Sequence, residues 1–310
     1  MAPVAILMAV AAACHTQATT PRYLYVVTCD ARVDKLDTIA GRKMASYDLA
    51  QDSEAKQLIP SAAGGFDGCL AYPAQLDAAA SAFYFVAPVQ ALAKPDGTRD
   101  YRVLGFSIPA IQLVKNMPAG SSLTDPPHLE ISPGGLPRTL PNSEWRPPTD
   151  IDLSTFAPNR AKLGNQIIES SGDRALLRIF TADPKDLMLA IANTKSKTIA
   201  TIQSLPPTTA LNAHLSPGGD AVLIEVTDRA GQPKKTGRLV LFDANTGGQI
   251  QEISDPIARD QYFLAISPSG KAIYHSGETY SFVALNRAFA TGPVIHALDS
   301  SYPAIFFANR

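Results

Sequence analysis

One short pattern occurs twice between Leu211 and Leu285, and it limits the fold of this chain more than any other feature. In each copy an apolar stretch runs into a Ser-Pro-x-Gly turn, first at Ser216–Gly219 and again at Ser267–Gly270. Proline presets φ at one turn position, and glycine accepts the positive φ that another position requires. A second and a third apolar stretch follow each turn. The pattern therefore predicts antiparallel strands joined by tight turns, repeated along the chain.

The same turn can be traced through most of the sequence. Turn glycines recur at Gly172, Gly219 and Gly270, and Gly135 and Ala80 occupy the matching places upstream. Repeated units of this length that contain only strands and turns are typical of β-propeller blades. The expected fold is therefore all-β, a single β-propeller over residues 21–310 with six blades. Seven blades are the alternative if the proline-rich insert at about 117–160 contains another unit.

The two ends of the chain complete each other in this scheme. The first unit begins directly with the strand Arg22–Thr28 and lacks an innermost strand. Near the other end, Tyr302–Phe307 is an apolar strand with no later partner. We expect the C-terminal strand to pair with the N-terminal blade and close the ring, because closure removes exposed strand edges.

The remaining strands of the first two units can also be placed. After Arg22–Thr28, we expect strands at Lys43–Leu49 and Ala55–Ile59, with the span between Cys29 and Arg42 as a long loop. The second unit has a hairpin tip at Asp96–Gly97, a dipeptide that favours tight hairpins. Its expected strands are Cys69–Leu76, Ala82–Pro88, Tyr101–Ile108 and Ile111–Lys115.

The span from Met117 to Arg160 is the irregular part of the chain. It holds nine prolines and the only tryptophan, Trp145. Proline cannot donate to a strand ladder, so most of this span is expected to lie outside central strands. Because strand units recur on both sides, we interpret it as a loop decorating one face of the propeller.

The first twenty residues are typical of a signal peptide and a linker. Met1–Ala13 carries no charge; it is too short to span a bilayer but has the length of a secretory apolar region. Cys14 follows three alanines, a partial match to a bacterial lipobox, and predicts lipidation at Cys14. Cleavage further on, near Thr16–Thr20, is the alternative. Both interpretations predict export, and the first predicts a lipid-anchored protein in the periplasm or outer cell envelope.

Cysteine usage agrees with export. If Cys14 carries lipid, Cys29 and Cys69 remain as an even pair in a compartment that permits disulfides. We therefore predict a Cys29–Cys69 disulfide, with two free buried thiols as the alternative.

Charge excludes some partners. The chain has 27 Lys and Arg against 28 Asp and Glu, whereas electrostatic capture of nucleic acid or of an acidic membrane surface needs a basic excess. We expect no nucleic-acid partner, contact with the membrane only through the lipid anchor, and a monomer.

The repeats resemble those of YVTN-type β-propeller proteins. The residues that carry the resemblance are Tyr25-Val26-Val27-Thr28, Ser267–Gly270 with Tyr274, and Asp243-Ala244-Asn245-Thr246-Gly247. The resemblance implies a fold and no particular activity, because these residues form strands and turns. That broad group includes secreted binding or scaffold proteins, lactonases and subunits of amine dehydrogenases, and no catalytic residue can be transferred from it.

Motifs for catalysis are missing from the sequence. It has no Gly-x-Ser-x-Gly elbow, no His-Glu-x-x-His, no phosphate loop ending in Gly-Lys and no Cys-x-x-Cys-His for haem. We expect no cofactor. Two acids in the proline-rich part, Asp150 and Asp152, are expected to be solvated, and Trp145 to anchor its own loop or contact a partner.

Aligning the turns gives one candidate site. The residue two places before the turn serine lies on the innermost strand, and this position is assigned to Gln75, Glu130, Ile167, His214 and Ala265. Convergence of Gln75, Glu130 and His214 at the channel mouth would make a ligand site, with the metal left open. The alternative is that these polar side chains only hydrate the channel.

Two functions follow from these observations. The first is a non-enzymatic binding or scaffold protein that recognises a protein or a cell-envelope ligand. The alternative is a propeller enzyme or enzyme subunit, a lactonase-like hydrolase or an amine-dehydrogenase-type protein, with its site at the channel mouth.

Overall fold

The computed structural model shows a chain built almost entirely of antiparallel strands. It describes residues 21–28, 32–58, 75–77, 79, 81–89, 94–123, 127–132, 135–140, 150–156, 164–180, 187–202, 210–227, 237–254, 261–276, 279–290 and 304–309. Within these ranges no helix has the length and apolar character needed to cross a membrane.

The strands among the described residues form five sheets and one hairpin. The first sheet has the order β21-β1-β2-β3, with β1 Tyr23–Val27, β2 Arg32–Asp37, β3 Arg42–Asp48 and β21 Ala304–Ala308. The second sheet contains β4 Gln75–Leu76, β5 Ala82–Pro88, β6 Arg99–Ser107 and β7 Leu113–Ser122. The β8–β9 hairpin pairs His128–Ile131 with Pro137–Leu140.

Three further sheets follow in chain order. The third sheet contains β10 Asn165–Ser171, β11 Arg174–Phe180, β12 Leu187–Asn193 and β13 Thr198–Thr201. The fourth contains β14 Ala210–Leu215, β15 Ala221–Thr227, β16 Gly237–Asp243 and β17 Gln249–Ser254. The fifth contains β18 Tyr262–Ser267, β19 Lys271–Ser276 and β20 Thr279–Ala284. Short helical turns lie at η1 Leu49–Gln51, α1 Ala55–Leu58 and η3 Leu153–Thr155.

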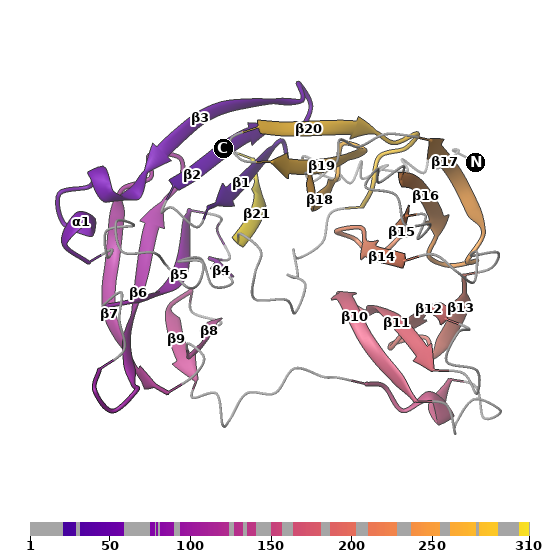
Figure 1. The fold of residues 1–310 in the computed structure, drawn as a ribbon, viewed down its shortest axis with the longest axis horizontal. Coiled ribbons are helices and arrows are strands. Elements are labelled where there is room, and N and C mark those ends of the chain that lie inside the picture. Colours follow the sequence, from indigo (N-terminus) through magenta and orange to yellow (C-terminus); the bar gives the residue numbers. More distant parts are fainter. Residues whose placement is uncertain are drawn as a thin grey trace, which may run out of the picture.

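The sheets follow one another around a common centre (Figure 1). Strands β21, β4, β8, β10, β14 and β18 lie on the side of their sheets nearest that centre (Figure 1). Strands that follow one another in the chain pair antiparallel within each sheet, an arrangement typical of propeller blades, and the first sheet adds β21 from the far end of the chain. The last strand, β21, pairs with β1 in the register Val26 opposite Ile305, which is the pairing that the sequence predicts between the two ends.

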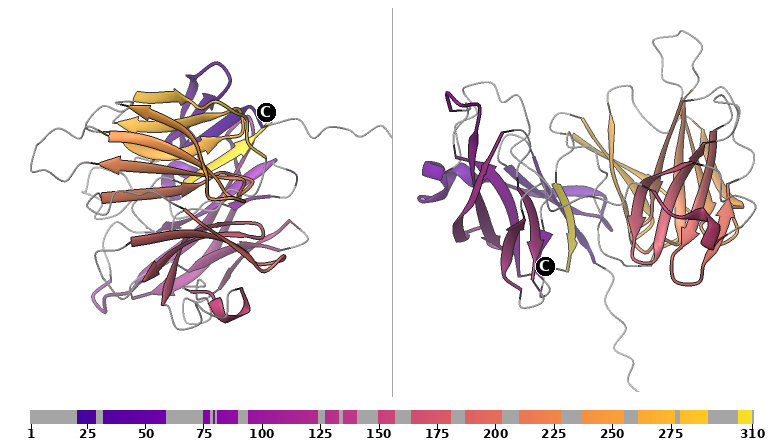
Figure 2. Two further views of the ribbon diagram at one scale, coloured as in Figure 1. Left: turned by 90° about the vertical axis from the view of Figure 1, so that its right-hand side faces the viewer. Right: turned by 90° about the horizontal axis from the view of Figure 1, so that it is seen from below.

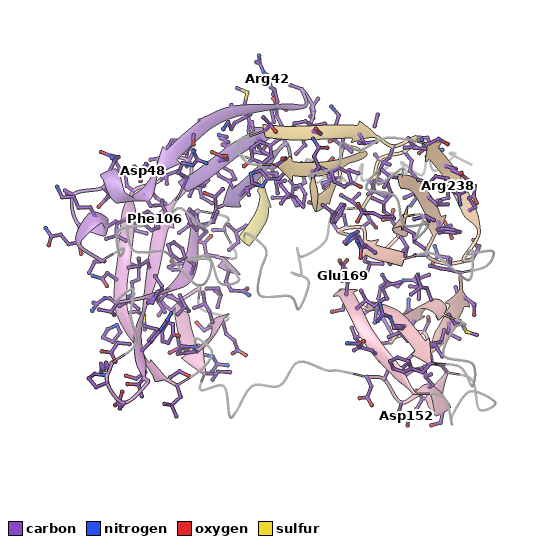
Figure 3. The ribbon with its side chains drawn as sticks, viewed as in Figure 1. Arg42, Asp48, Phe106, Asp152, Glu169 and Arg238 are labelled. Atoms are coloured by element: carbon purple, nitrogen blue, oxygen red, sulfur yellow. The ribbon has the colours of Figure 1, made fainter. Side chains whose placement is uncertain are left out.

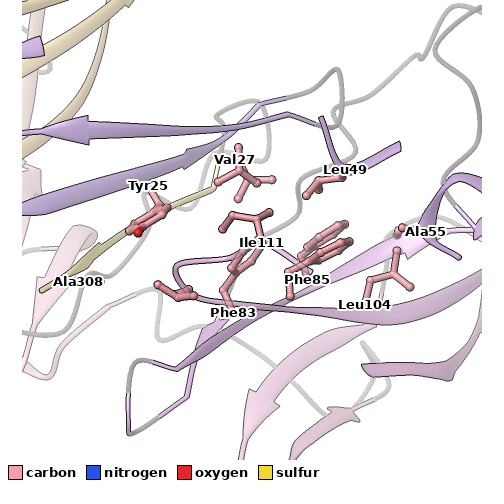
Figure 4. Packing of buried hydrophobic residues seen from close by; sticks show 13 residues of the cluster. Tyr25, Val27, Leu49, Ala55, Phe83, Phe85, Leu104, Ile111 and Ala308 are labelled. Carbon is pink, nitrogen blue, oxygen red and sulfur yellow. The ribbon is translucent and has the colours of Figure 1, made fainter. Parts of the chain in front are cut away.

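Buried residues lie mainly between neighbouring sheets, which pack face to face (Figure 2). Tyr25 of the first sheet meets three phenylalanines of the second, Phe83, Phe85 and Phe106, whose rings stack with centroids 5.7 to 6.2 Å apart (Figure 4). Similar clusters join the third sheet to the fourth, the fourth to the fifth and the fifth to the first. Packing between neighbouring sheets therefore stabilises each of them, and the third sheet also has a buried cluster with the segment that contains η3.

The Ser-Pro-x-Gly turns form as predicted. Gly219 and Gly270 have φ of +69° and +81°, and each donates its backbone N–H to the carbonyl of the turn serine. Gly219 also permits close approach of the next sheet, since a Cβ there would lie 2.7 Å from Cβ of Arg174. These glycines therefore serve both the turn and the contact between sheets.

Two expectations for the first unit are wrong. The span expected as a long loop contains β2, which buries residues on both of its faces, Val33 on one and the hydrogen-bonded Asp34 on the other. The expected strand Ala55–Ile59 is instead the helical turn α1. Its cause is Asp52, whose Oδ1 accepts the backbone N–H groups of Glu54 and Ala55 at 3.0 Å and so begins a helix.

The proline-rich span contains more strand than expected. Strand β7 continues to Ser122 through Pro118, and β9 begins at Pro137. β7 is an edge strand and Pro137 is the first residue of its strand, which are the positions where proline costs no ladder hydrogen bond. Trp145 lies outside the described residues.

Candidate functional site

His214 lies at the meeting point of three sheets. It is on β14, the strand of the fourth sheet nearest the centre (Figure 1). Its Nδ1 is 3.0 Å from Oε1 of Glu169 on β10, and its Nε2 is 3.4 Å from Oε2 of Glu225 on β15. Its ring stacks on Phe263 of β18, with centroids 3.7 Å apart and planes 17° apart. One imidazole therefore contacts the third, fourth and fifth sheets.

Glu169 reaches this position because of a bulge in β10. The register of β10 against β11 shifts between Ile167 and Glu169, and Glu169 lies at the end of β10 next to β14 (Figure 3). Its Oε2 accepts the backbone N–H of Leu215 at 2.6 Å. β14 is an edge strand, so this N–H has no partner within its own sheet. The carboxylate of Glu169 therefore satisfies a backbone donor as well as the imidazole.

The surroundings favour the charged form of His214. Burial lowers the pKa of His214, but hydrogen bonds and charges from Glu169 and Glu225 outweigh it and raise the pKa to about 9. Tyr274 is fully buried on β19, edge-on to Phe263. Burial, followed by the charge of Glu225, raises the pKa of the Tyr274 phenol. At neutral pH the cluster holds one imidazolium between two carboxylates.

These contacts join three sheets and leave His214 no ring nitrogen for a ligand. Both ring nitrogens of His214 already face a carboxylate, so neither is open to a metal ion or a substrate proton. Within the described ranges no group of three or more His, Cys, Asp or Glu side chains is arranged to hold a metal.

The other two residues assigned to the channel mouth are on the inner strands β4 and β8. Glu130 accepts two hydrogen bonds from Arg138 of the same hairpin, at 3.0 Å from Nε and 2.6 Å from Nη2. Gln75 is on β4, opposite Tyr84. No hydrogen bond or ion pair among the described residues joins Gln75 or Glu130 to His214. A ligand site formed by all three stays a prediction.

At two inner-strand positions the alignment of the turns names a residue that does not face His214, namely Ile167 and Ala265. Ile167 is buried in the core of the third sheet, and Glu169 faces the site in its place. Counting two places back from Ser171, whose Oγ donates to the carbonyl of Pro217 beside the matching turn serine, would have found Glu169. At the fifth sheet the bulge between Phe263 and Ala265 brings Phe263 to the histidine, and the sequence carries no signal for that shift.

The structure does not test the predictions made for the cysteines. Cys14, Cys29 and Cys69 fall outside the described residues, so lipidation and the disulfide stay predictions. Asp152 is described and caps η3, accepting the backbone N–H of Ser154 at 3.0 Å. It serves local structure at the edge of the third sheet (Figure 3).

Comparisons with known proteins find only distant likenesses in structure. No protein-family model matches the sequence, and no curated protein matches it. The GH74 xyloglucanase from Xanthomonas campestris is 14% identical, with a TM-score of 0.35 over 84% of this chain and 43% of its own. The Dos1 propeller is 9% identical, with a TM-score of 0.23 over 81% of this chain and 52% of its own.

A third solved structure has a length similar to that of this chain. A candidate 6-phosphogluconolactonase from Bacteroides fragilis is 11% identical, with a TM-score of 0.43 over 94% of this chain and 99% of its own. By contrast, this chain spans about half the length of the first two structures. The arrangement of sheets described above rests on the strands of this chain alone.

Proposed function

We propose that this chain is an exported six-bladed β-propeller that binds a protein or cell-envelope ligand without catalysis, held to the membrane by lipid at Cys14. The five sheets and the β8–β9 hairpin would supply the six blades. Pairing of β21 with β1 supports a closed ring, because it removes the open inner edge of the first blade.

The observation that carries the binding role is the distribution of exposed apolar side chains. The described residues include seven large apolar side chains that are exposed, and four of them belong to the second sheet, the β8–β9 hairpin or their connections. These four are Val89, Val114, Leu123 and Leu136, of which Leu123 and Leu136 are 69% and 64% exposed. We infer a partner-binding role for this part of the chain because apolar side chains are exposed there more often than elsewhere among the described residues, at both ends of β7 and in neighbouring turns.

The ionisable groups near the centre support binding over catalysis. His214 is neutralised by two carboxylates and Glu130 by Arg138. A general acid or base needs a proton that it can exchange with a substrate, and these five side chains are paired within two separate groups instead.

Site-directed crosslinking tests this function. A photo-crosslinking residue placed at Leu123 or Leu136 should capture one defined envelope component, and the same residue at Ser196, an exposed turn position of the third sheet, should not. Equal capture from all three positions would contradict the proposed surface. The intact mass of the protein purified from the membrane fraction tests the lipid anchor separately. A diacylated Cys14 adds a defined mass, whereas a soluble protein of unmodified mass would refute the anchor.

A further inference from the structure

A half-buried lysine that has no acidic partner among the described residues lies in the first sheet, on the face that packs against the second. Lys35 is on β2, opposite Tyr25 of β1 and Ala45 of β3. Tyr25 and Val33, its neighbours on that face, belong to the apolar cluster shared with the second sheet. An ammonium group in such a position loses hydration and needs compensation from the protein or from a ligand.

Tyrosine rings supply part of that compensation. Nζ of Lys35 lies 4.1 Å from the ring centroid of Tyr23 and 5.5 Å from that of Tyr25. The guanidinium carbon of Arg22 lies 5.4 Å from the same Tyr23 ring. One ring therefore contacts two cations, and cation–π attraction is weaker than the penalty of removing a charge from water.

The acid next to this pair of cations is already occupied. Asp37 lies opposite Tyr23, and its Oδ2 accepts from Nε of Arg22 at 2.9 Å and from Nη2 at 2.5 Å. Its Oδ1 accepts the backbone N–H groups of Ile39 and Ala40. The hydrogen bonds from Arg22 and the two backbone donors hold the pKa of Asp37 at about 2. Its carboxylate is therefore ionised at neutral pH and already paired with Arg22.

The charge of Lys35 has no compensating anion among the described residues. In the described part of the chain Lys35 makes no hydrogen bond or ion pair. Two cations and one carboxylate leave one positive charge uncompensated. Burial without an anion lowers the pKa of Lys35, which agrees with this geometry.

We propose that Lys35, between the rings of Tyr23 and Tyr25, binds a small singly charged oxyanion, a carboxylate. The three N–H donors of the ammonium match carboxylate oxygens, and the single missing charge matches a monoanion. The aromatic walls favour a ligand with a short apolar part beside its carboxylate. This site is independent of the apolar surface proposed for a partner.

Nuclear magnetic resonance of the mature chain tests the site, with lysines labelled at 13Cε and acetate as the probe. Acetate replaces chloride at constant ionic strength, so screening does not change. The Lys35 signal should shift with saturation, and its titration midpoint should move to higher pH in acetate. Lys197 is the matched control, because its Nζ also lies over an aromatic ring, Phe156 at 5.0 Å, but beside the carboxylate of Asp152.

Substitutions separate binding from folding. Saturation transfer from protein to the acetate methyl group should persist in Lys35→Arg and fall at least fivefold in Lys35→Met. Equal transfer in wild type and Lys35→Met would overturn the proposal, as would Lys35 and Lys197 signals that respond alike. If Lys35→Met does not fold, the wild-type Lys35 signal decides alone. Inorganic phosphate in place of acetate shows whether the site prefers a monoanion, and a stronger response to phosphate would refute the carboxylate assignment.

Discussion

Removal of the imidazole at position 214 should make the stability of the chain depend less on pH. The pKa of His214 is raised from 6.5 to about 9 in the folded protein. A raised pKa means that the folded state holds the proton more tightly than the unfolded state does. The resulting stability is fully present below pH 6.5 and is lost as the pH rises through 9.

The size of this effect follows from the difference between the two values. The shift of 9 minus 6.5 is 2.5 pH units, and at about 1.4 kcal/mol for each unit the ion pairs contribute roughly 3 kcal/mol at low pH. His214 is nearly buried, with 17% of its side chain exposed, so screening by solvent removes little of this. Total stabilities of about 5–15 kcal/mol are usual, and the cluster is therefore a sizeable part.

Urea unfolding of wild type and His214→Gln at pH 6 and pH 10 measures the difference. Glutamine keeps a hydrogen-bond donor but cannot carry the charge. We expect the variant to be less stable by about 3 kcal/mol at pH 6 and by much less at pH 10. Glu169→Gln should lower the midpoint of the histidine titration, observed directly by nuclear magnetic resonance. A destabilisation that is the same at both pH values, or a His214 midpoint near 6.5, would refute the reasoning.

Three further substitutions test the contacts between sheets, each by urea unfolding. Tyr280→Phe removes the 2.6 Å hydrogen bond to buried Asp34 and should cost about 1–3 kcal/mol, whereas an unchanged midpoint would mean that Asp34 is satisfied without it. Gly247→Ala combines a φ of +70° with a Cβ 2.2 Å from the carbonyl of Thr201 and should cost more than about 2 kcal/mol, unlike Gly248→Ala. Phe106→Ala in the stacked cluster should cost about 3–5 kcal/mol, and a loss below 1 kcal/mol would contradict its full burial.

The sequence predicts the strands and turns well where one local rule decides them. Glycine at the αL position of a tight turn and a continuous run of apolar residues can be recognised without knowledge of a partner, as at Gly219 and along β5. The pairing of β21 with β1 could be predicted because the first unit lacks an inner strand and the C-terminal apolar strand has no other partner in the sequence pattern.

The parts that could not be predicted depend on contacts between sheets. Asp34 looks like a loop residue in sequence, but in the structure its carboxylate accepts from Ser46 of β3 and from Tyr280 of β20, distant in the chain. The bulges that bring Glu169 and Phe263 to His214 likewise shift the register by one residue, and a one-residue shift moves a side chain to the other face.

The pairing of β21 with β1 also governs when this chain can finish folding. The first sheet is built from residues near both ends, since Tyr23 lies opposite Ala308. Its inner position stays vacant until Ala304–Ala308 have been made, and an unfilled strand position invites pairing with other chains. Loss of a few C-terminal residues would therefore damage the start of the molecule more than its end.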